Sequence, residues 1–540
     1  MMRATAVLSM LHEPFGERNS ARRLFRDRPV LWWTLERLRA TRSIGSTAIL
    51  CWEDQLAEVK SIAEEQDIYV LAKGPRCVVP TMDGVSAARR WAEGWRGGLM
   101  QTCEFDRGFH GPWLMELALK LSADTMVLID PSAALVDPIL IDAVIHHAEE
   151  NPEAPLVFSQ AAPGLSGVVL RFELLKQLAA VNSHPGKFIH YQPTQPCRDP
   201  IAEKACAAVA TPIARTSHRF TLDSQRQVER VDRATLHLNG ELMQTGAEEL
   251  VRSLNEVESC DSLPREVILE LTTRRATRPV FMPAGQLAMG RADLSLEMAK
   301  DLFDQLAEAD DLRLTFGGVG DALLSPCFFE MVQAARQAGI TAIHARTDLL
   351  EMTPELIARL AATSVDVVSI QIPAITAVTY QAVMGVDGLS RVLDNVKTFV
   401  EQRWKRGQAT PILVPVFTKC RENLAEMEVW YDRWLAALGS AVIAGANDYA
   451  GQIPDHSVAD MSPPRRRACG RLASRMHVLS DGKIVSCEQD VLGRQPLGDL
   501  ATNRVADVWA QRFAALRSDH RRGEWDKHSL CGNCREWHRP

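Results

Sequence analysis

Short apolar runs alternate with helical patterns along most of this 540-residue chain. Five runs near the N-terminus indicate buried strands, at residues 4–11, 46–52, 67–72, 125–130 and 155–159. Between them, residues 30–39 and 138–148 have the apolar spacing of helices. This alternation predicts an α/β domain over residues 1–245, with a parallel sheet covered by helices on both faces.

A second region repeats the alternation. The more polar residues 246–265 are expected to form a linker. The rhythm then resumes over residues 266–453, where the predicted strands are residues 267–271, 312–316, 341–346, 366–372 and 411–417. Successive βα units of this kind are compatible with a complete or partial (β/α) barrel. Residues 454–468 are again linker-like, and their run Arg465–Arg467 is expected to be solvated.

Composition excludes several classes of protein. The chain is 46% apolar and 24% charged, which is typical of a globular protein. A net charge of −7 argues against a dedicated nucleic-acid binder. No apolar run approaches the roughly 18 residues that a membrane helix requires, and the N-terminus favours a buried strand over a signal peptide. We therefore expect a cytoplasmic protein, with no nucleic-acid partner and no membrane span, whose cysteines are mostly reduced.

Four of the twelve cysteines lie in the tail, residues 469–540: Cys469, Cys487, Cys531 and Cys534. Residues 475–479 and 483–486 are predicted to form a hairpin around Asp481-Gly482, which brings Cys469 and Cys487 together. The C-x-x-C spacing of the other two lets one loop grip a metal or a cluster. Four thiolates bind zinc and iron–sulfur clusters alike, so spacing alone leaves both open.

The tail resembles a SPASM domain, the auxiliary iron–sulfur module at the end of many radical SAM enzymes. The resemblance rests on Cys469-x12-Gly482-x4-Cys487, LGDLATNRVADVW (497–509), FAALR (513–517) and Cys531-x2-Cys534. It implies that Cys469, Cys487, Cys531 and Cys534 ligate one [4Fe–4S] cluster. With Pro540 ending the chain, we expect room for only one cluster. Such a tail is also a candidate surface for a protein partner.

The middle region resembles the radical SAM barrel. LTFGGVGDALLSP (314–326) is similar to the family's glycine loop, which holds S-adenosylmethionine, and implies that Gly318, Gly320 and Asp321 are remnants of that site. TDLL (347–350), SIQIPAITAVTY (369–380) and KCRENLAEM (419–427) resemble later motifs of the same family.

The loop LTTRRATRPVFMP (271–283) departs from that family. Radical SAM enzymes carry C-x3-C-x2-C directly after the first strand, and the three positions here are Arg275, Pro279 and Met282. None of these can supply a thiolate to iron. We therefore expect a degenerate core that keeps the fold without S-adenosylmethionine chemistry. A radical enzyme using other ligands is the competing interpretation.

The N-terminal domain resembles cytidylyltransferase-like nucleotidyltransferases, which share the nucleotide-diphospho-sugar transferase fold. The resemblance rests on RPVLWWTLERLR (28–39), MVLID (126–130), DPILIDAVI (137–145) and HRFTLDSQRQVERV (218–231). It implies that Arg18, Arg22, Asp130 and Asp223 bind a nucleotide or nucleotide-sugar with Mg²⁺. The usual G-S-x-R-x-P-G-K order is absent, so turnover is in question. Alternatively, Asp130 merely caps the end of its strand.

Together these observations predict a three-part protein acting in nucleotide-sugar or glycan modification. Its parts are a nucleotidyltransferase-like domain, a degenerate radical-SAM-like barrel and a cluster-binding tail. Two alternatives stay open: an active Mg²⁺-dependent nucleotidyltransferase acting on a sugar phosphate, and a non-catalytic scaffold whose tail holds zinc. Whether the chain is an enzyme is therefore left open.

Overall fold

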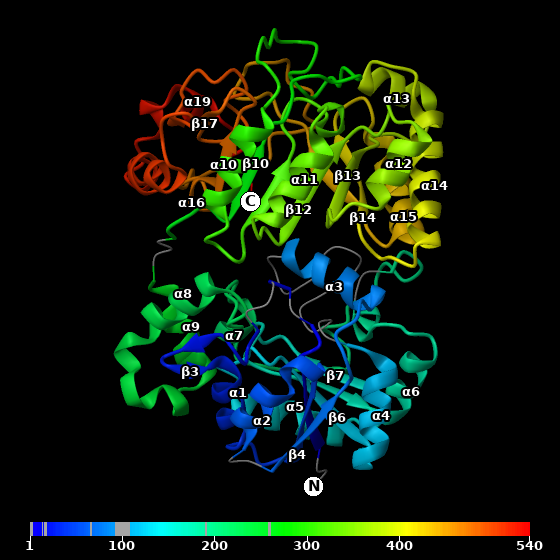
Figure 1. The fold of residues 1–540 in the computed structure, drawn as a ribbon, viewed down its shortest axis with the longest axis vertical. Coiled ribbons are helices and arrows are strands. Elements are labelled where there is room, and N and C mark those ends of the chain that lie inside the picture. Colours follow the sequence, from blue (N-terminus) through cyan, green and yellow to red (C-terminus); the bar gives the residue numbers. More distant parts are fainter. Residues whose placement is uncertain are drawn as a thin grey trace. The chain divides into compact units, whose positions relative to one another are not determined.

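The chain divides into two compact units, Met1–Ser259 and Cys260–Pro540 (Figure 1). The computed structural model describes residues 4–12, 14–15, 19–64, 67–91, 109–189, 192–257 and 261–539. Among these residues, no helix is long and apolar enough to cross a membrane.

The first unit is built on a sheet of seven described strands in the order β5-β4-β1-β6-β8-β7-β9. Their bounds are β1 Ala4–Ser9, β4 Ile44–Cys51, β5 Ile68–Ala72, β6 Thr125–Ile129, β7 Leu156–Ser159, β8 Val168–Arg171 and β9 Cys206–Ala207. All five predicted strands are present. However, β8 was not predicted and runs antiparallel to β6 and β7. The sheet is therefore mixed, not wholly parallel as expected.

Helices cover both faces of this sheet, as predicted. One side carries α1 (Val30–Leu38), α2 (Leu56–Ala63) and α5 (Pro138–Glu150); the other carries α3 (Pro80–Trp91), α4 (Gly111–Leu121) and α6 (Phe172–Ala180). Alternate residues of β1 separate between two apolar clusters. Ala6 and Leu8 pack in the cluster with Leu35 of α1, whereas Val7 packs with Leu117 of α4. This alternation follows from the two-residue period of a strand.

Part of the predicted linker at residues 246–265 is instead helix α9, Ala247–Asn255. Its residues Leu250, Val251 and Leu254 are buried in an apolar cluster with α8, Gln225–Thr235. Their spacing places them on one face of a helix. The linker prediction is wrong for this stretch, because charged residues on the exposed face of α9 masked its apolar face.

The second unit is built on an open sheet of nine described strands in the order β15-β14-β13-β12-β11-β10-β16-β17-β18. The bounds are β10 Glu266–Leu269, β11 Arg313–Phe316, β12 Ala342–Thr347, β13 Val367–Gln371, β14 Ile412–Lys419, β15 Val442–Gly445, β16 Arg475–Val478, β17 Lys483–Val485 and β18 Gly498–Asp499. All five strands predicted in the middle region are confirmed. Strands β10 to β15 are parallel to their neighbours.

Helices alternate with these parallel strands, as the sequence rhythm predicts. They are α10 Leu296–Leu306, α11 Phe328–Gln337, α12 Pro354–Ala361, α13 Ala377–Met384, α14 Leu389–Lys405 and α15 Met427–Leu438 (Figure 1). One face of the sheet is apolar. Its residues Leu269, Phe316 and Ile343 share a core cluster with Phe303 of α10 and Leu360 of α12. The opposite face is polar and is described below.

The tail shares its sheet with the middle region. The predicted hairpin is confirmed as β16 and β17, and β16 continues the sheet by pairing in parallel with β10. Trp509 and Phe513, from the segment after the hairpin, lie in the same core cluster as the middle region. The described residues of the second unit therefore share one sheet and a main apolar cluster, a continuity between middle region and tail that the sequence did not predict.

Candidate functional site

The four tail cysteines come from three different elements. Cys469 precedes α16 (Arg471–Ser474), Cys487 follows β17, and Cys531 and Cys534 belong to α19 (Ser529–Asn533) and its C-cap. Between the first two, the hairpin reverses at Gly482, whose φ of +87° suits glycine. All four are free, partly buried thiols.

These four thiols lie within electrostatic reach of one another. Burial raises the pKa of Cys487 to about 12, and Cys469 and Cys534 push it in the same direction. Burial likewise raises the pKa of Cys531 to about 12, again with contributions from the other three cysteines. Thiolates crowded in this way are unfavourable until positive charge neutralises them. A metal group supplies that charge, and its binding releases the thiol protons.

The possible donor set is the four cysteine thiols of the tail. Within the described parts of the chain, no group of three or more His, Cys, Asp or Glu side chains is arranged to hold a single metal ion. The cysteines nevertheless influence one another's pKa. Four cysteine thiols are the ligand set of iron–sulfur clusters and of structural zinc alike, so the donor set fits both.

The second notable feature is the polar face of the second unit's sheet. Strand register places these residues on the side away from the helices: Glu266, Arg313, Thr315, His344, Arg346, Ser369, Gln371, Arg475 and His477. They bond to one another. The Thr315 hydroxyl donates to Glu266 Oε1 at 3.0 Å, and His344 Nε2 lies 2.7 Å from Ser369 Oγ. The sequence analysis did not predict this polar face, although polar residues at every second position of the strands are the pattern that such a face produces.

Two Arg–carboxylate pairs stand near this face. Arg291 Nη2 lies 2.7 Å from Glu270 Oε1, directly after β10. Arg346 on β12 pairs with Glu488, the residue after Cys487. Burial alone would raise the pKa of Glu488, but Arg346 and other nearby cations lower it to about 2. The carboxylate is therefore ionised and holds the cysteine segment against the sheet.

A third pair lies in the loop 271–283. Arg275 Nε lies 2.8 Å from Asp348 Oδ2, and its Nη2 contacts the other carboxylate oxygen. Both side chains are buried, with 6% and 1% exposed. Arg275 Nη1 also donates to Val319 O at 3.1 Å, and the Thr277 hydroxyl donates to Asp348. The loop is therefore held in place by a buried ion pair and the hydrogen bonds around it.

The predicted glycine loop is packed against this ion-pair region. Gly318 has φ +133°, and a Cβ there would lie 2.9 Å from Glu270 Cβ. At Gly320 a Cβ would lie 2.0 Å from Thr272 O, within the loop 271–283. Asp321 Oδ2 accepts from Thr347 Oγ1 at 2.9 Å and from Asp348 N at 3.0 Å, and burial raises the Asp321 pKa. Contacts within the protein are therefore enough to explain why glycine is required at Gly318 and Gly320 and why a carboxylate stands at Asp321.

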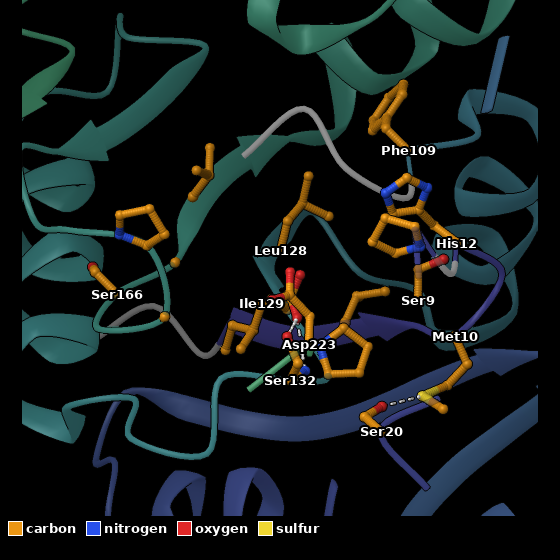
Figure 2. Close-up of a pocket in the computed structure, with 18 of the residues that line it drawn as sticks. Ser9, Met10, His12, Ser20, Phe109, Leu128, Ile129, Ser132, Ser166 and Asp223 are labelled. Atoms are coloured by element: carbon orange, nitrogen blue, oxygen red, sulfur yellow. Dashed lines mark hydrogen bonds between the residues drawn. The ribbon is translucent and has the colours of Figure 1, made fainter. Parts of the chain in front are cut away.

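The third feature is a pocket in the first unit, of about 1240 Å³ including its open mouth. It lies at the carboxyl ends of β1 and β6, and both Asp130 and Asp223 line it. Figure 2 shows Asp223 beside Ile129 and Ser132 in this pocket. The Ser132 N–H donates to Asp130 Oδ1 at 2.7 Å. Arg89 Nη2 lies 2.6 Å from Asp223 Oδ2 and so partly neutralises that carboxylate. Two of the predicted nucleotide-site residues are therefore brought together.

The two arginines predicted to bind the nucleotide are not found among the described residues that line the pocket. Arg22 Nε lies 2.9 Å from Glu58 Oε1 on the surface and does not line the pocket. Arg18 lies outside the described residues. Arg23, which follows Arg22 in the sequence, does line the pocket. Ser166 also lines it, and its buried hydroxyl has no hydrogen-bond partner among the described residues. The sequence offered no way to choose Arg23 over Arg22, because the two are adjacent in an irregular loop.

Comparison with known families decides the nature of the tail. Residues 469–535 match the SPASM family, described as an iron–sulfur cluster-binding domain. These residues form a SPASM domain. All four cysteines lie within the match, which ends one residue after Cys534. Iron–sulfur binding is therefore the property that the SPASM domain brings to this chain.

More distant similarities were also found. A curated relative, an uncharacterized protein of Treponema pallidum (strain Nichols), is 30% identical over 131 residues. That match covers 24% of this chain and only about a third (36%) of the relative.

Solved structures show weaker likeness. BtrN in complex with AdoMet and 2-DOIA is 15% identical, covering 51% of this chain and 94% of BtrN, with a TM-score of 0.37. Streptococcus suis SuiB is 12% identical, covering 52% of this chain and 73% of SuiB, with a TM-score of 0.39. A cytidylyltransferase from Leptospira borgpetersenii serovar Hardjo-bovis (strain JB197) is 13% identical, covering 47% and 94%, with a TM-score of 0.33.

Proposed function

We propose that this chain is an iron–sulfur protein that binds one [4Fe–4S] cluster in its SPASM domain and performs no radical chemistry in its middle region. The ligands are Cys469, Cys487, Cys531 and Cys534. The observation that supports the absence of radical chemistry is the buried Arg275–Asp348 pair. Arg275 stands where the resemblance to radical SAM enzymes requires the first cluster cysteine.

The surroundings of Arg275 support this proposal. A catalytic cluster would need three thiolates at Arg275, Pro279 and Met282, but an arginine repels iron and a proline has no side-chain ligand. The Arg275 guanidinium is also fully engaged, by Asp348 and by the Val319 carbonyl. The loop therefore gains its order from an internal ion pair instead of a metal.

The residues around the four tail cysteines would hold the proposed cluster in place. A bound cluster supplies a one-electron centre and a covalent link between its ligands. The chain's own residues hold the thiols in place: β16 and β17 position Cys487, and Glu488 ties the segment to Arg346 on β12. We propose that this centre is structural or passes single electrons to a partner.

Metal and sulfide analysis after anaerobic purification tests the tail. We expect about four iron and four sulfide per chain, lost in a Cys531→Ser/Cys534→Ser variant. The matched control is Cys77→Ser, since Cys77 is exposed and lies in the other unit. Zinc without sulfide in the wild-type protein would contradict the cluster and favour the scaffold alternative.

Reductive cleavage of S-adenosylmethionine tests the middle region. The protein with all four tail cysteines replaced by serine is incubated with dithionite and S-adenosylmethionine. We expect no 5′-deoxyadenosine, because the loop 271–283 has no cysteine to bind a catalytic cluster. Formation of 5′-deoxyadenosine by this variant would show that a radical enzyme with other ligands is present.

A second candidate function belongs to the first unit. We propose that its pocket binds a nucleotide or nucleotide-sugar with Mg²⁺, in the setting of nucleotide-sugar or glycan modification. The supporting observation is that Asp130 and Asp223 line one pocket at the carboxyl ends of β1 and β6, where α/β sheets commonly bind ligands. Because Arg89 already partly neutralises Asp223, we favour binding over nucleotidyl transfer.

Calorimetric titration with CTP and CDP-sugars, with and without Mg²⁺, tests this candidate. Binding should weaken in Asp130→Ala and persist in Asp54→Ala, a surface carboxylate paired with Arg76. Pyrophosphate release with a sugar phosphate would instead establish a nucleotidyltransferase. Absence of binding by every nucleotide tried would remove the candidate.

A further inference from the structure

Arg466 is turned inward, unlike its two neighbours. Arg465 and Arg467 are exposed, whereas Arg466 is partly buried. Its Nη2 donates to Cys531 O, and its Nη1 donates to Gly532 O at 3.3 Å. The solvated run expected from the sequence is therefore interrupted at its central residue.

An aromatic ring holds the guanidinium in this position. Arg466 Cζ lies 4.8 Å from the centroid of the Trp525 ring. A planar guanidinium can stack on a ring while its edge donates hydrogen bonds, which an ammonium cannot do. Arg466 thus bridges Trp525 and the carbonyls of the C-x-x-C segment.

Those carbonyls belong to the short helix that carries the cysteine pair. α19 spans Ser529–Asn533, and Cys534 is its C-cap. The last carbonyls of a helix have no partner within it and favour a cation nearby. The Cys534 N–H also donates to Cys531 O at 3.2 Å, so Arg466 braces the carbonyl that already joins the two cysteines.

The same guanidinium places a positive charge beside the cysteine pair, because it is bonded to the main chain of Cys531 and of the next residue.

We propose that Arg466 is a positioning residue of the cluster: it fixes the Cys531–Cys534 loop and offsets the negative charge of the bound ligands. This inference rests on the proposed cluster. Groups behind metal ligands typically change metal affinity about 10–100-fold when removed. Arg466 is such a group, from a segment that the sequence assigned to a linker.

The test compares Arg466→Gln and Arg466→Lys with two matched controls, Arg465→Gln and Arg467→Gln. The full-length protein is purified anaerobically, and its secondary structure is checked by circular dichroism. Three properties are measured: iron and sulfide per chain, the rate of iron release to a chelator, and the midpoint potential of the tail centre.

We expect the controls to match the wild type. Arg466→Gln should release iron about tenfold faster or more, and its midpoint potential should fall because a positive charge that stabilised the reduced centre is gone. Arg466→Lys should recover most of the potential but little of the slow release, since lysine restores charge without the two-carbonyl bridge.

Equal release rates and potentials in Arg466→Gln and Arg465→Gln would overturn the inference. The outcomes also distinguish a failure of this inference from a failure of the proposed cluster. Zinc in place of iron and sulfide would overturn the cluster, and the zinc release rates of the same variants would then decide the positioning role. A release rate that rises equally in all three glutamine variants would show a general charge effect and overturn the specific role of Arg466.

Discussion

At the scale of single residues, Arg275 and Asp348 matter most for the middle region. Both are buried, so removal of one leaves an unpaired charge in the interior. We predict that Arg275→Ala destabilises the protein by about 3–5 kcal/mol, whereas Arg275→Met/Asp348→Leu recovers most of that loss. Urea unfolding of the three proteins measures the difference.

The control for this prediction is an exposed pair. Arg391 and Glu351 lie 3.5 Å apart with about half of each side chain exposed. Arg391→Ala should cost no more than about 1 kcal/mol. A similar small cost for Arg275→Ala would mean that the buried pair does not order its loop.

His344 gives a pH-dependent prediction. Burial, with Arg346 nearby, lowers its pKa to about 3, although Glu488 acts in the opposite direction. The folded protein therefore keeps His344 neutral below pH 6.5, where the unfolded chain takes up a proton. Stability from this group is present above pH 6.5 and is lost as pH falls toward 3.

When the pH is lowered from 7 to 5, His344 should reduce the free energy of unfolding of the wild type by about 2 kcal/mol. A His344→Asn variant should show a pH dependence weaker by that amount. Unfolding curves at both pH values measure it, and comparison of the two proteins cancels other titrating groups. Parallel pH dependences would show that His344 is protonated in the folded state.

At the scale of elements, periodicity predicted most strands and helices. Each predicted strand was a short apolar run, and burial on a sheet is the cause of such runs. Strand β8 was missed because Val168–Arg171 is short and follows a loop rather than a helical pattern. Helix α9 was missed because its charged side dominates its composition.

Pairing between distant elements left no local trace in the sequence. Strand β16 joins β10 although about 200 residues separate them, and nothing in the local sequence predicted that the tail would extend the sheet of the middle region. Sequence spacing was enough to predict that the four cysteines act together, since C-x-x-C and the hairpin turn are local patterns. Arg466 could not be identified, because its partners, the Cys531 and Gly532 carbonyls, are main-chain atoms that carry no residue signal.

At the scale of the whole molecule, the division into Met1–Ser259 and Cys260–Pro540 separates the pocket from the cysteines. We predict that residues 261–540, produced alone, retain the iron and sulfide of the full chain. Residues 469–540 alone should not, because β16 loses its partner β10, and Trp509 and Phe513 lose their shared core. A module this small rarely has enough apolar core to fold unaided.

Iron and sulfide analysis and circular dichroism of the two fragments measure this. The fragment 261–540 should be folded and contain metal, and 469–540 should be largely unfolded even after cluster reconstitution. A folded, cluster-bearing 469–540 would show that the cluster supplies enough free energy to fold the tail without the sheet. In that case the pairing of β16 with β10 would be a docking contact between domains and not part of one fold.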